Sequence, residues 1–196
     1  MPAGPDPRPH IGRPRRADAR RNYEQLVEQA KVAFAEFGVD ASLDEIARRA
    51  GVASGTLYRH FPTRLDLIEA VLGEQIAELV GRGRGLLSAE DELDALATWL
   101  RALLLHGLTY RGLAAAVLNS ALDRGDLMST WHAGMFAVGA ALLARARESG
   151  AIVADADAAD VLRMVSAIAW AVQDSQDSAA QADRLLALLL NGLRRR

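Results

Sequence analysis

Residues 42–64, SLDEIARRAGVASGTLYRHFPTR, constrain the fold of this chain more than any other segment. Ser42 and Glu45 have the spacing of a capping box, and the apolar residues after Ser42 recur at helical spacing. Gly51 follows the last of them, where a helix end often needs a left-handed residue. A second short helix ends before Pro62, because proline disfavours helical geometry at the residue that precedes it. The segment therefore predicts two short helices joined by a glycine turn, the helix-turn-helix arrangement.

The second helix of this unit, expected to be capped by Ser54, has the features of a helix that lies in the DNA major groove. Leu57 and Phe61 form its inward pair, and its other side chains are small, hydroxyl-bearing or basic. Arginine pairs bidentately with guanine, so Arg59 is the candidate for reading a base. A third helix restarts at Thr63, and a helix N-terminus suits a phosphate. The predicted DNA contacts are Ser42, Ser54, Gly55, Thr56, Tyr58, Arg59, His60 and Arg64.

The segment LDEIARRAGVASGTLYRHFPTRLDLIEAV resembles the DNA-binding domain of the tetracycline-repressor (TetR) family of transcriptional regulators, and the resemblance extends over about residues 19–79. It implies that Tyr58 and His60 contact phosphates or bases. It also implies that Arg64 stands where the family often has a lysine on a phosphate. The ligand domains of this family diverge widely, so the resemblance implies no particular effector.

The charge distribution agrees with a DNA-binding N-terminal part. The net charge is −2 overall, but residues 1–64 hold 11 Lys and Arg against 8 Asp and Glu, whereas residues 65–196 hold 12 against 17. Local potential decides attraction to phosphate, so the basic half favours nucleic acid despite the acidic total.

Composition excludes several other classes of protein. There are no cysteines, and the four histidines show no metal-ligand spacing, so neither a disulfide, a metal nor another cofactor is expected. No signal peptide and no stretch of the ~20 apolar residues needed to cross a bilayer are apparent, which favours a cytoplasmic protein without a membrane partner.

The sequence divides the chain into three regions. Residues 1–17 hold five of the six prolines and read as a disordered basic arm, either a plain solvated tail or an arm that adds DNA contacts. Residues 18–80, which contain the motif at 42–61, form the DNA-binding domain, with Asp18 as a possible cap of its first helix. The glycine-arginine run that opens residues 81–196 reads as a flexible connector.

The rest of the chain shows helical patterns and no alternating strand pattern, so the predicted class is all-α, with a three-helix DNA-binding domain and a helical C-terminal domain for effector binding and dimerisation. The expected C-terminal helices cover residues 90–110, 113–123, 126–149, 157–174 and 178–192.

Aromatic side chains and a few polar side chains occur in three consecutive predicted helices and in the helix after them. Small-molecule pockets are lined by side chains of these two kinds. Ordinary core packing is the alternative for each of these residues. The candidates for an effector pocket are Trp99, His106, Tyr110, Asn119, Met128, Trp131, His132, Met135, Met164 and Trp170.

The last two helices are apolar over so much of their surface that more than one face must be covered. A second chain is the simplest cover, and burial within one chain is the alternative. The predicted dimer residues are Val161, Val165, Ile168, Leu185, Leu186, Leu189 and Leu193.

Together these features predict a homodimeric repressor that binds a palindromic operator in double-stranded DNA and is released by an unknown small-molecule effector. A twofold dimer places two recognition helices one helical turn apart. The alternatives are a DNA-binding regulator that needs no small ligand or activates transcription and, more remotely, a helical enzyme. Against the enzyme, the chain shows no nucleophile–base pattern, no paired carboxylates in an apolar setting and no glycine-rich phosphate loop.

Overall fold

The computed structural model describes residues 14–120, 125–173 and 175–195, without the side chains at 14–16, 111, 114–120 and 125–131. Within these ranges the chain is helical, apart from loops and an isolated bridge between Ile152 and Arg194, so the all-α prediction is confirmed. The elements are α1 (Pro14–Phe37), the 3-10 turn η1 (Gly38–Asp40), α2 (Leu43–Arg49), α3 (Ser54–His60), α4 (Arg64–Leu86), α5 (Glu92–Ser120), α6 (Gly125–Glu148), α7 (Ala158–Ala171) and α8 (Ser178–Leu193).

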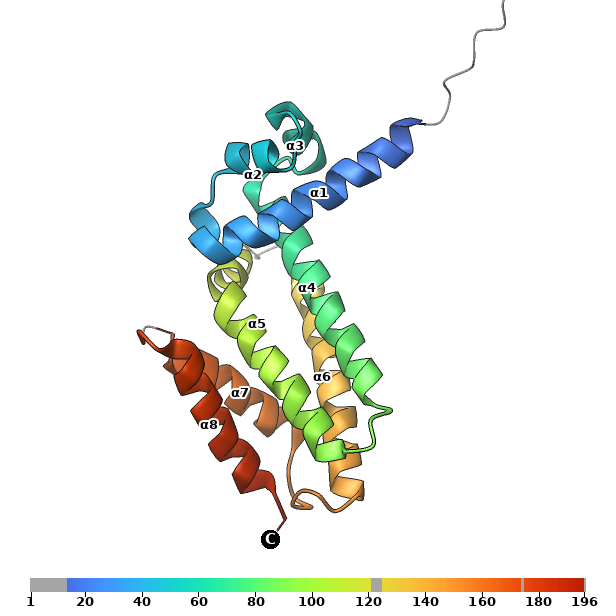
Figure 1. Cartoon of the computed structure of the whole chain (residues 1–196), viewed down its shortest axis with the longest axis vertical. Helices are drawn as coiled ribbons and strands as arrows, with labels where there is room; N and C mark the ends of the chain where they lie inside the picture. Colours follow the sequence, from blue (N-terminus) through green and yellow to red (C-terminus); the bar gives the residue numbers. More distant parts are fainter. Residues whose placement is uncertain (1–13, 121–124, 174, 196) are drawn as a thin grey trace, which may run out of the picture.

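The described side chains form two hydrophobic cores. The first joins α1, α2, α3 and the beginning of α4, with Phe34, Ile46 and Leu57 at its centre. The second runs from Leu79 of α4 through α5, α6, α7 and α8. Figure 1 shows the same division, with α1, α2 and α3 gathered at one end of the long helices and α7 and α8 beside their other half.

Helix α4 crosses from one core to the other without interruption. It continues to Leu86, so the prediction that residues 81–85 form a flexible connector is wrong. Glycine is unfavourable in a helix by ~1 kcal/mol relative to alanine, but tertiary packing overrides this preference. Gly83 is buried, and a Cβ built there would lie 2.3 Å from Cγ1 of Val138 and 2.5 Å from Nε1 of Trp99. The glycine is therefore what lets α4 approach α5 and α6 so closely.

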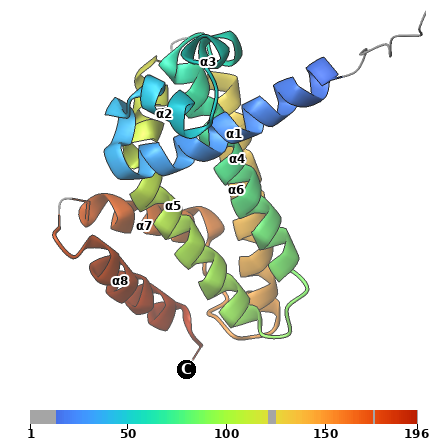
Figure 2. The same cartoon turned by 45° about the horizontal axis from the view of Figure 1, so that its top comes forward.

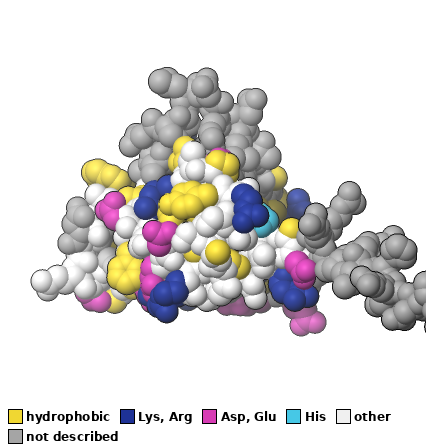
Figure 3. Space-filling view, turned by 90° about the horizontal axis from the view of Figure 1, so that it is seen from above, with side chains coloured by type: hydrophobic (Ala, Val, Ile, Leu, Met, Phe, Trp, Pro, Cys, Tyr) yellow, Lys and Arg dark blue, Asp and Glu magenta, His cyan; other side chains and the backbone are white. Residues whose placement is uncertain are grey.

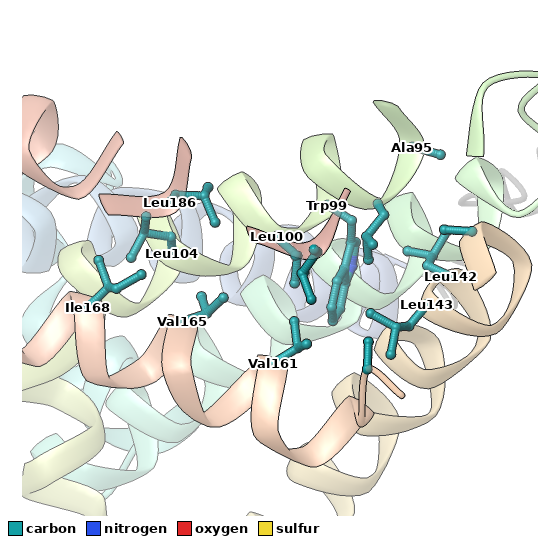
Figure 4. Packing of buried hydrophobic residues seen from close by; sticks show 14 of the residues in the cluster. Ala95, Trp99, Leu100, Leu104, Leu142, Leu143, Val161, Val165, Ile168 and Leu186 are labelled. Carbon is teal, nitrogen blue, oxygen red and sulfur yellow. The ribbon is translucent and has the colours of Figure 1, made fainter. Parts of the chain in front are cut away.

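Trp99 of α5 is the side chain at the centre of this approach (Figure 4). It is completely buried, and its indole N–H donates to the carbonyl oxygen of Leu79 at 3.1 Å. On its other side the ring lies against Gly139 of α6, where a Cβ would come within 2.9 Å of Cζ3. Two glycines thus make the slot that holds the ring, and the hydrogen bond removes the cost of burying the indole N–H.

Helix α5 is one continuous helix, whereas the sequence analysis expected a break between residues 110 and 113. Its early part packs in the second core through Leu96, Leu100 and Leu104. Its later part reaches the first core, where Leu113 is buried and Tyr110 packs against the cluster. Since a helix rises ~1.5 Å per residue, the 29 residues of α5 are long enough to reach both cores.

The first helix begins earlier than expected. Residues 1–13 of the predicted arm lie outside the described residues, but α1 starts at Pro14, so Asp18 does not cap it. Proline is well suited to the first helical position because its missing N–H has no partner to lose there.

Gly83→Ala is expected to lower the free energy of unfolding by about 1–3 kcal/mol, because the added methyl overpacks the contact with Trp99 and Val138. Gly81→Ala is the matched control: the position is exposed in the same helix, nothing lies within 4 Å of its Cβ, and the change should stabilise by ~0.5–1 kcal/mol. Urea denaturation followed by circular dichroism measures both, and equal effects of the two changes would contradict the close-packing role of Gly83.

Candidate DNA-binding surface

Helices α2 and α3 form the helix-turn-helix unit, with geometry close to the prediction. Gly51 has φ 69°, the left-handed value expected at the end of α2. The amide of Val52 then donates to the carbonyl oxygen of Ala47 at 3.0 Å, which closes the turn. Leu57 and Phe61 are buried beneath α3, so the inward pair is confirmed.

The helix caps are confirmed in part. The Ser42 hydroxyl accepts from the amide of Glu45 at 3.3 Å, whereas the Glu45 carboxylate pairs with Arg48 and Arg49 instead of turning back to Ser42. The cap residue of α3 is Ala53, and no side chain caps that helix, so the prediction that Ser54 caps it is wrong. Ser54 is instead its first helical residue, which leaves its hydroxyl exposed.

The outward face of α3 is exposed to solvent in this conformation. Tyr58 is 47% exposed, Ser54, Gly55 and Arg59 are exposed, and Thr56 and His60 are partly exposed. Seen from this end of the molecule, basic side chains are spread over the face among polar and apolar groups (Figure 3). All of the residues predicted on α3 thus keep at least part of their surface free for a ligand.

The two arginines predicted to contact DNA are held by backbone carbonyls. The Arg59 Nε donates to the carbonyl oxygen of Gly55 at 3.0 Å within α3. The half-buried Arg64 reaches across to the carbonyl oxygens of Val39 and Ala41, with 2.8 Å from Nη1 to the oxygen of Val39. Arg64 therefore joins the start of α4 to the segment between α1 and α2, in addition to any part it takes in DNA binding.

Tyr23 of α1 is a residue of this surface that the sequence analysis did not include. Its ring packs edge-on against His60, with 6.2 Å between centroids, and lies 5.1 Å from Phe61. Burial and the nearby charge of Glu74 raise the pKa of its hydroxyl. Its helical spacing ahead of Leu26 and Val27 was the available signal, because it places Tyr23 on the apolar stripe of α1.

Charge on α2 is partly neutralised by its own residues. Hydrogen bonds from Arg48 and Arg49 lower the pKa of Glu45 to about 2, so its carboxylate is ionised at neutral pH. Arg49 also pairs with Glu36 of α1, at 3.4 Å. These two arginines consequently offer less free positive charge to a phosphate than their number suggests.

A cluster of four charged residues, which we call the Lys31 cluster, joins α1 to α4. The Lys31 Nζ lies 3.1 Å from carboxylate oxygens of both Glu74 and Glu78, and 3.4 Å from that of Glu28. Burial alone lowers the pKa of Lys31, but its hydrogen bonds with Glu74 and Glu78 outweigh that effect and raise the pKa above its ordinary value. The only lysine of the chain thus fixes the first helix to the helix that leaves the DNA-binding domain.

Of the residues predicted to line an effector pocket, His106 and Tyr110 line one cavity together among the described side chains, with 5.3 Å between their ring centroids. Trp99 belongs to the closed core, whereas Met164 and Trp170 are exposed on α7. His132 is exposed and Met135 half-buried on α6, while the side chains of Asn119, Met128 and Trp131 lie outside those that the structure describes.

The residues predicted to form the dimer interface lie mainly inside one chain. Leu185 and Leu189 are half-buried against the second core. The large apolar side chains that α7 and α8 leave exposed are instead Met164, Trp170 and Leu188. Five of the predicted residues are buried within the single chain, which is the alternative to a dimer contact: Val161, Val165, Ile168, Leu186 and Leu193.

Two further observations concern the described residues alone. They contain no group of three or more His, Cys, Asp or Glu side chains placed to hold a metal ion. Nor do their helices combine the length and apolar character that a bilayer span requires.

Comparison with known proteins finds matches to both parts of the chain. The family described as bacterial regulatory proteins, tetR family, matches residues 26–71. The family described as transcriptional regulator SbtR-like, C-terminal domain, matches residues 91–195, which is more than half of the chain.

Curated relatives match over the DNA-binding domain. The HTH-type transcriptional regulator SrpR of Pseudomonas putida is 40% identical over 60 residues, which are 30% of this chain and 28% of SrpR. The uncharacterized HTH-type transcriptional regulator TtgW, also of Pseudomonas putida, is likewise 40% identical over 60 residues, 30% of this chain and 45% of TtgW. The chain therefore spans less than half the length of these two relatives.

Solved structures match over nearly the whole fold. The TetR transcriptional regulator SCO0520 from Streptomyces coelicolor is 36% identical with a TM-score of 0.75, covering 88% of this chain and 98% of that one. The TetR transcription regulatory protein from Mycobacterium vanbaalenii is 34% identical with a TM-score of 0.72, covering 93% and 100%. FadR from Bacillus subtilis, crystallised in complex with stearoyl-CoA, shares the fold alone, at 22% identity and a TM-score of 0.60 over 88% and 100% of the two chains.

A helix-turn-helix unit with an exposed second helix, a separate helical body and these matches agree, and the chain belongs to the TetR family of DNA-binding transcriptional regulators.

Proposed function

We propose that this protein is a cytoplasmic repressor that binds a palindromic operator as a homodimer and is released by a small-molecule effector. The observation that carries the proposal is the outward face of α3. Tyr58 and Arg59 are exposed on the face opposite two buried residues, Leu57 and Phe61, so α3 can enter a groove without disturbing the core.

Homodimer formation is supported by the exposed apolar side chains of the last two helices. Trp170 is 69% exposed, and Met164 and Leu188 are also more than half exposed. Side chains of this size are a source of favourable burial when a second copy covers them. A twofold pair would present two α3 helices to one duplex, which is what a palindromic site requires.

Release by an effector needs a connection between the helical body and α3. Both α4 and α5 pass from one core to the other, so a change in their packing in the body reaches the DNA-binding domain directly. A ligand shifts the equilibrium between the DNA-binding arrangement and the released arrangement only by its different affinities for the two. A typical coupling of ~1–3 kcal/mol changes DNA affinity ~5–150-fold. That FadR was crystallised with stearoyl-CoA supports a ligand site in a fold of this kind.

An activator, or a regulator without a small ligand, would use the same α3 surface and remains the second candidate. Selection of bound sequences from random duplexes tests the proposal as a whole. A recovered inverted repeat with half-sites about one helical turn apart is the expected result. Recovery of no preferred sequence, or of a single half-site only, would contradict the operator and dimer assignments.

Tyr58→Ala is expected to weaken binding to the selected duplex about tenfold, because an exposed hydroxyl and ring are lost from the face presented to DNA. Fluorescence anisotropy at several salt concentrations measures the effect. Arg163→Ala is the control, because its exposed side chain lies on α7 and pairs only with the neighbouring Asp160 in the described structure. Equal affinities for the wild type and Tyr58→Ala would remove Tyr58 from the contact surface.

Arg59→Ala is expected to relax the sequence preference at one base position of each half-site, by about 1–3 kcal/mol against the wrong base, if its guanidinium leaves Gly55 to read a base edge. Repeating the duplex selection with the variant measures this. An unchanged preference combined with a uniformly weaker affinity would assign Arg59 to a phosphate instead.

Trp170→Glu is expected to yield a folded monomer, because this side chain is exposed in one protomer and a charge in an apolar contact prevents association. Sedimentation equilibrium measures the mass and circular dichroism the fold. Val32→Glu, at another exposed apolar position on α1, is the control for adding a charge to the surface. A dimer of wild-type strength in the Trp170 variant would exclude this face.

A further inference from the structure

A cavity of about 350 Å³ lies between α4 and α5, along the middle stretch of both helices, between Gln75 and Arg82 of α4 and between Thr98 and Tyr110 of α5. The two helices run side by side in both views (Figures 1 and 2). Residues from both helices line the cavity, among them Gln75, Arg82, Arg101, Leu105, His106 and Tyr110. Its volume is near the lower end of the ~300–1,000 Å³ of small-molecule sites, so only a small ligand fits.

The charged groups that line this cavity are cationic. Arg82 and Arg101 are there, and no carboxylate is. Of the nearby acids, Glu78 pairs with Lys31, whereas Asp183 pairs with Arg101 itself at 2.9 Å and so partly neutralises that arginine. Arg82 is exposed and makes no ion pair within the part of the chain that the structure describes. An anion at this place would therefore meet an arginine that no described carboxylate pairs with.

The rest of the cavity offers two aromatic rings and an apolar side chain, beside the polar residues Gln75, Thr98 and Thr109. His106 and Tyr110 lie one helical turn apart with their rings in a tilted contact, and Leu105 beside them is 47% exposed. Burial, together with the charge of Arg82, lowers the pKa of His106, so its imidazole is neutral at physiological pH and suits stacking. The exposed side chain of Leu105 therefore offers a ligand an apolar surface beside the two rings.

We propose that the α4–α5 cavity binds a small aromatic carboxylate. Its ring lies against His106, Tyr110 and Leu105, and its carboxylate pairs with Arg82, with Arg101 at the same rim. Arginine recognises a carboxylate by two parallel hydrogen bonds, and the adjoining rings supply the apolar part of the affinity. The site therefore selects its ligand by charge as well as by shape, since a neutral ligand of the same shape cannot form the ion pair with Arg82.

The position of the cavity connects it to the DNA-binding domain, and this step rests on the proposed function. Tyr110 packs against the first core, and its hydroxyl lies close enough to the Lys31 cluster for Lys31, Glu78 and Glu28 to affect its pKa. Leu113, one turn further along α5, is buried in that core. A ligand seated on Tyr110 therefore touches α5 where it enters the DNA-binding domain and α4 where it leaves.

Benzoate and benzamide, which share a shape and differ in charge, test the proposal on the full chain without DNA. Isothermal titration calorimetry at low ionic strength is expected to show benzoate binding at least about tenfold more tightly than benzamide. Arg82→Gln should remove most of this difference, because the exposed position tolerates the change and only the charge is lost. Arg163→Gln, which changes an exposed arginine of α7, should leave it intact.

Equal binding of benzoate and benzamide, no binding of benzoate, or a preference that survives Arg82→Gln would each overturn the site. Binding is measured in the absence of DNA, so these outcomes are independent of whether the protein represses. In a second measurement, benzoate should change the affinity of the wild type for the selected duplex by about fivefold or more. Arg82→Gln should abolish this response, and benzoate binding that leaves wild-type operator affinity unchanged would overturn the coupling through Tyr110.

Discussion

The seating of Trp99 against α4 is the interaction on which the rest of this structure depends. The ring occupies a slot that exists because Gly83 and Gly139 have no side chain, and its N–H is satisfied by the Leu79 carbonyl. Three helices are brought together by this one side chain (Figure 4). Since α4 also carries the DNA-binding domain at its other end, the contact sets where that domain stands relative to the body. A buried polar group that finds its partner in a neighbouring helix favours one packing arrangement over others of similar apolar area.

Two helices cross between the cores, and their roles differ. Helix α4 is joined to α1 by the Lys31 cluster and begins with a complete capping box, in which Thr63 and Asp66 satisfy each other's amides. Helix α5 crosses as one continuous helix and enters the first core through Tyr110 and Leu113. The arrangement gives the body two helical connections to the domain that carries α3.

Most local rules in the sequence were reliable where they act over a few residues, although the predicted caps at Asp18 and Ser54 are absent. The glycine turn at Gly51, the anchors Leu57 and Phe61 and the restart at Thr63 appear as expected, because each depends on bonds or contacts within one or two turns of helix. They were unreliable at Gly83, where the glycine-arginine run suggested a connector, and at residues 110–113, where two helices were expected instead of one. Glycine disfavours a helix only weakly, and long-range packing exceeds that preference at Gly83, so the helix continues.

The sequence by itself determined the helical class, the helix-turn-helix unit and which side chains of α3 face inward, because the periodicity of apolar residues and the capping residues specify these locally. Tertiary structure alone decided which apolar faces of α7 and α8 are buried inside the protomer. An apolar pattern states that a face must be buried but not against what, so Val165 lies in the core while Trp170 stays exposed. It also decided that Trp99 packs in the core while His106 and Tyr110 share a cavity with Arg82, because side chains far apart in the chain meet only once the helices have packed.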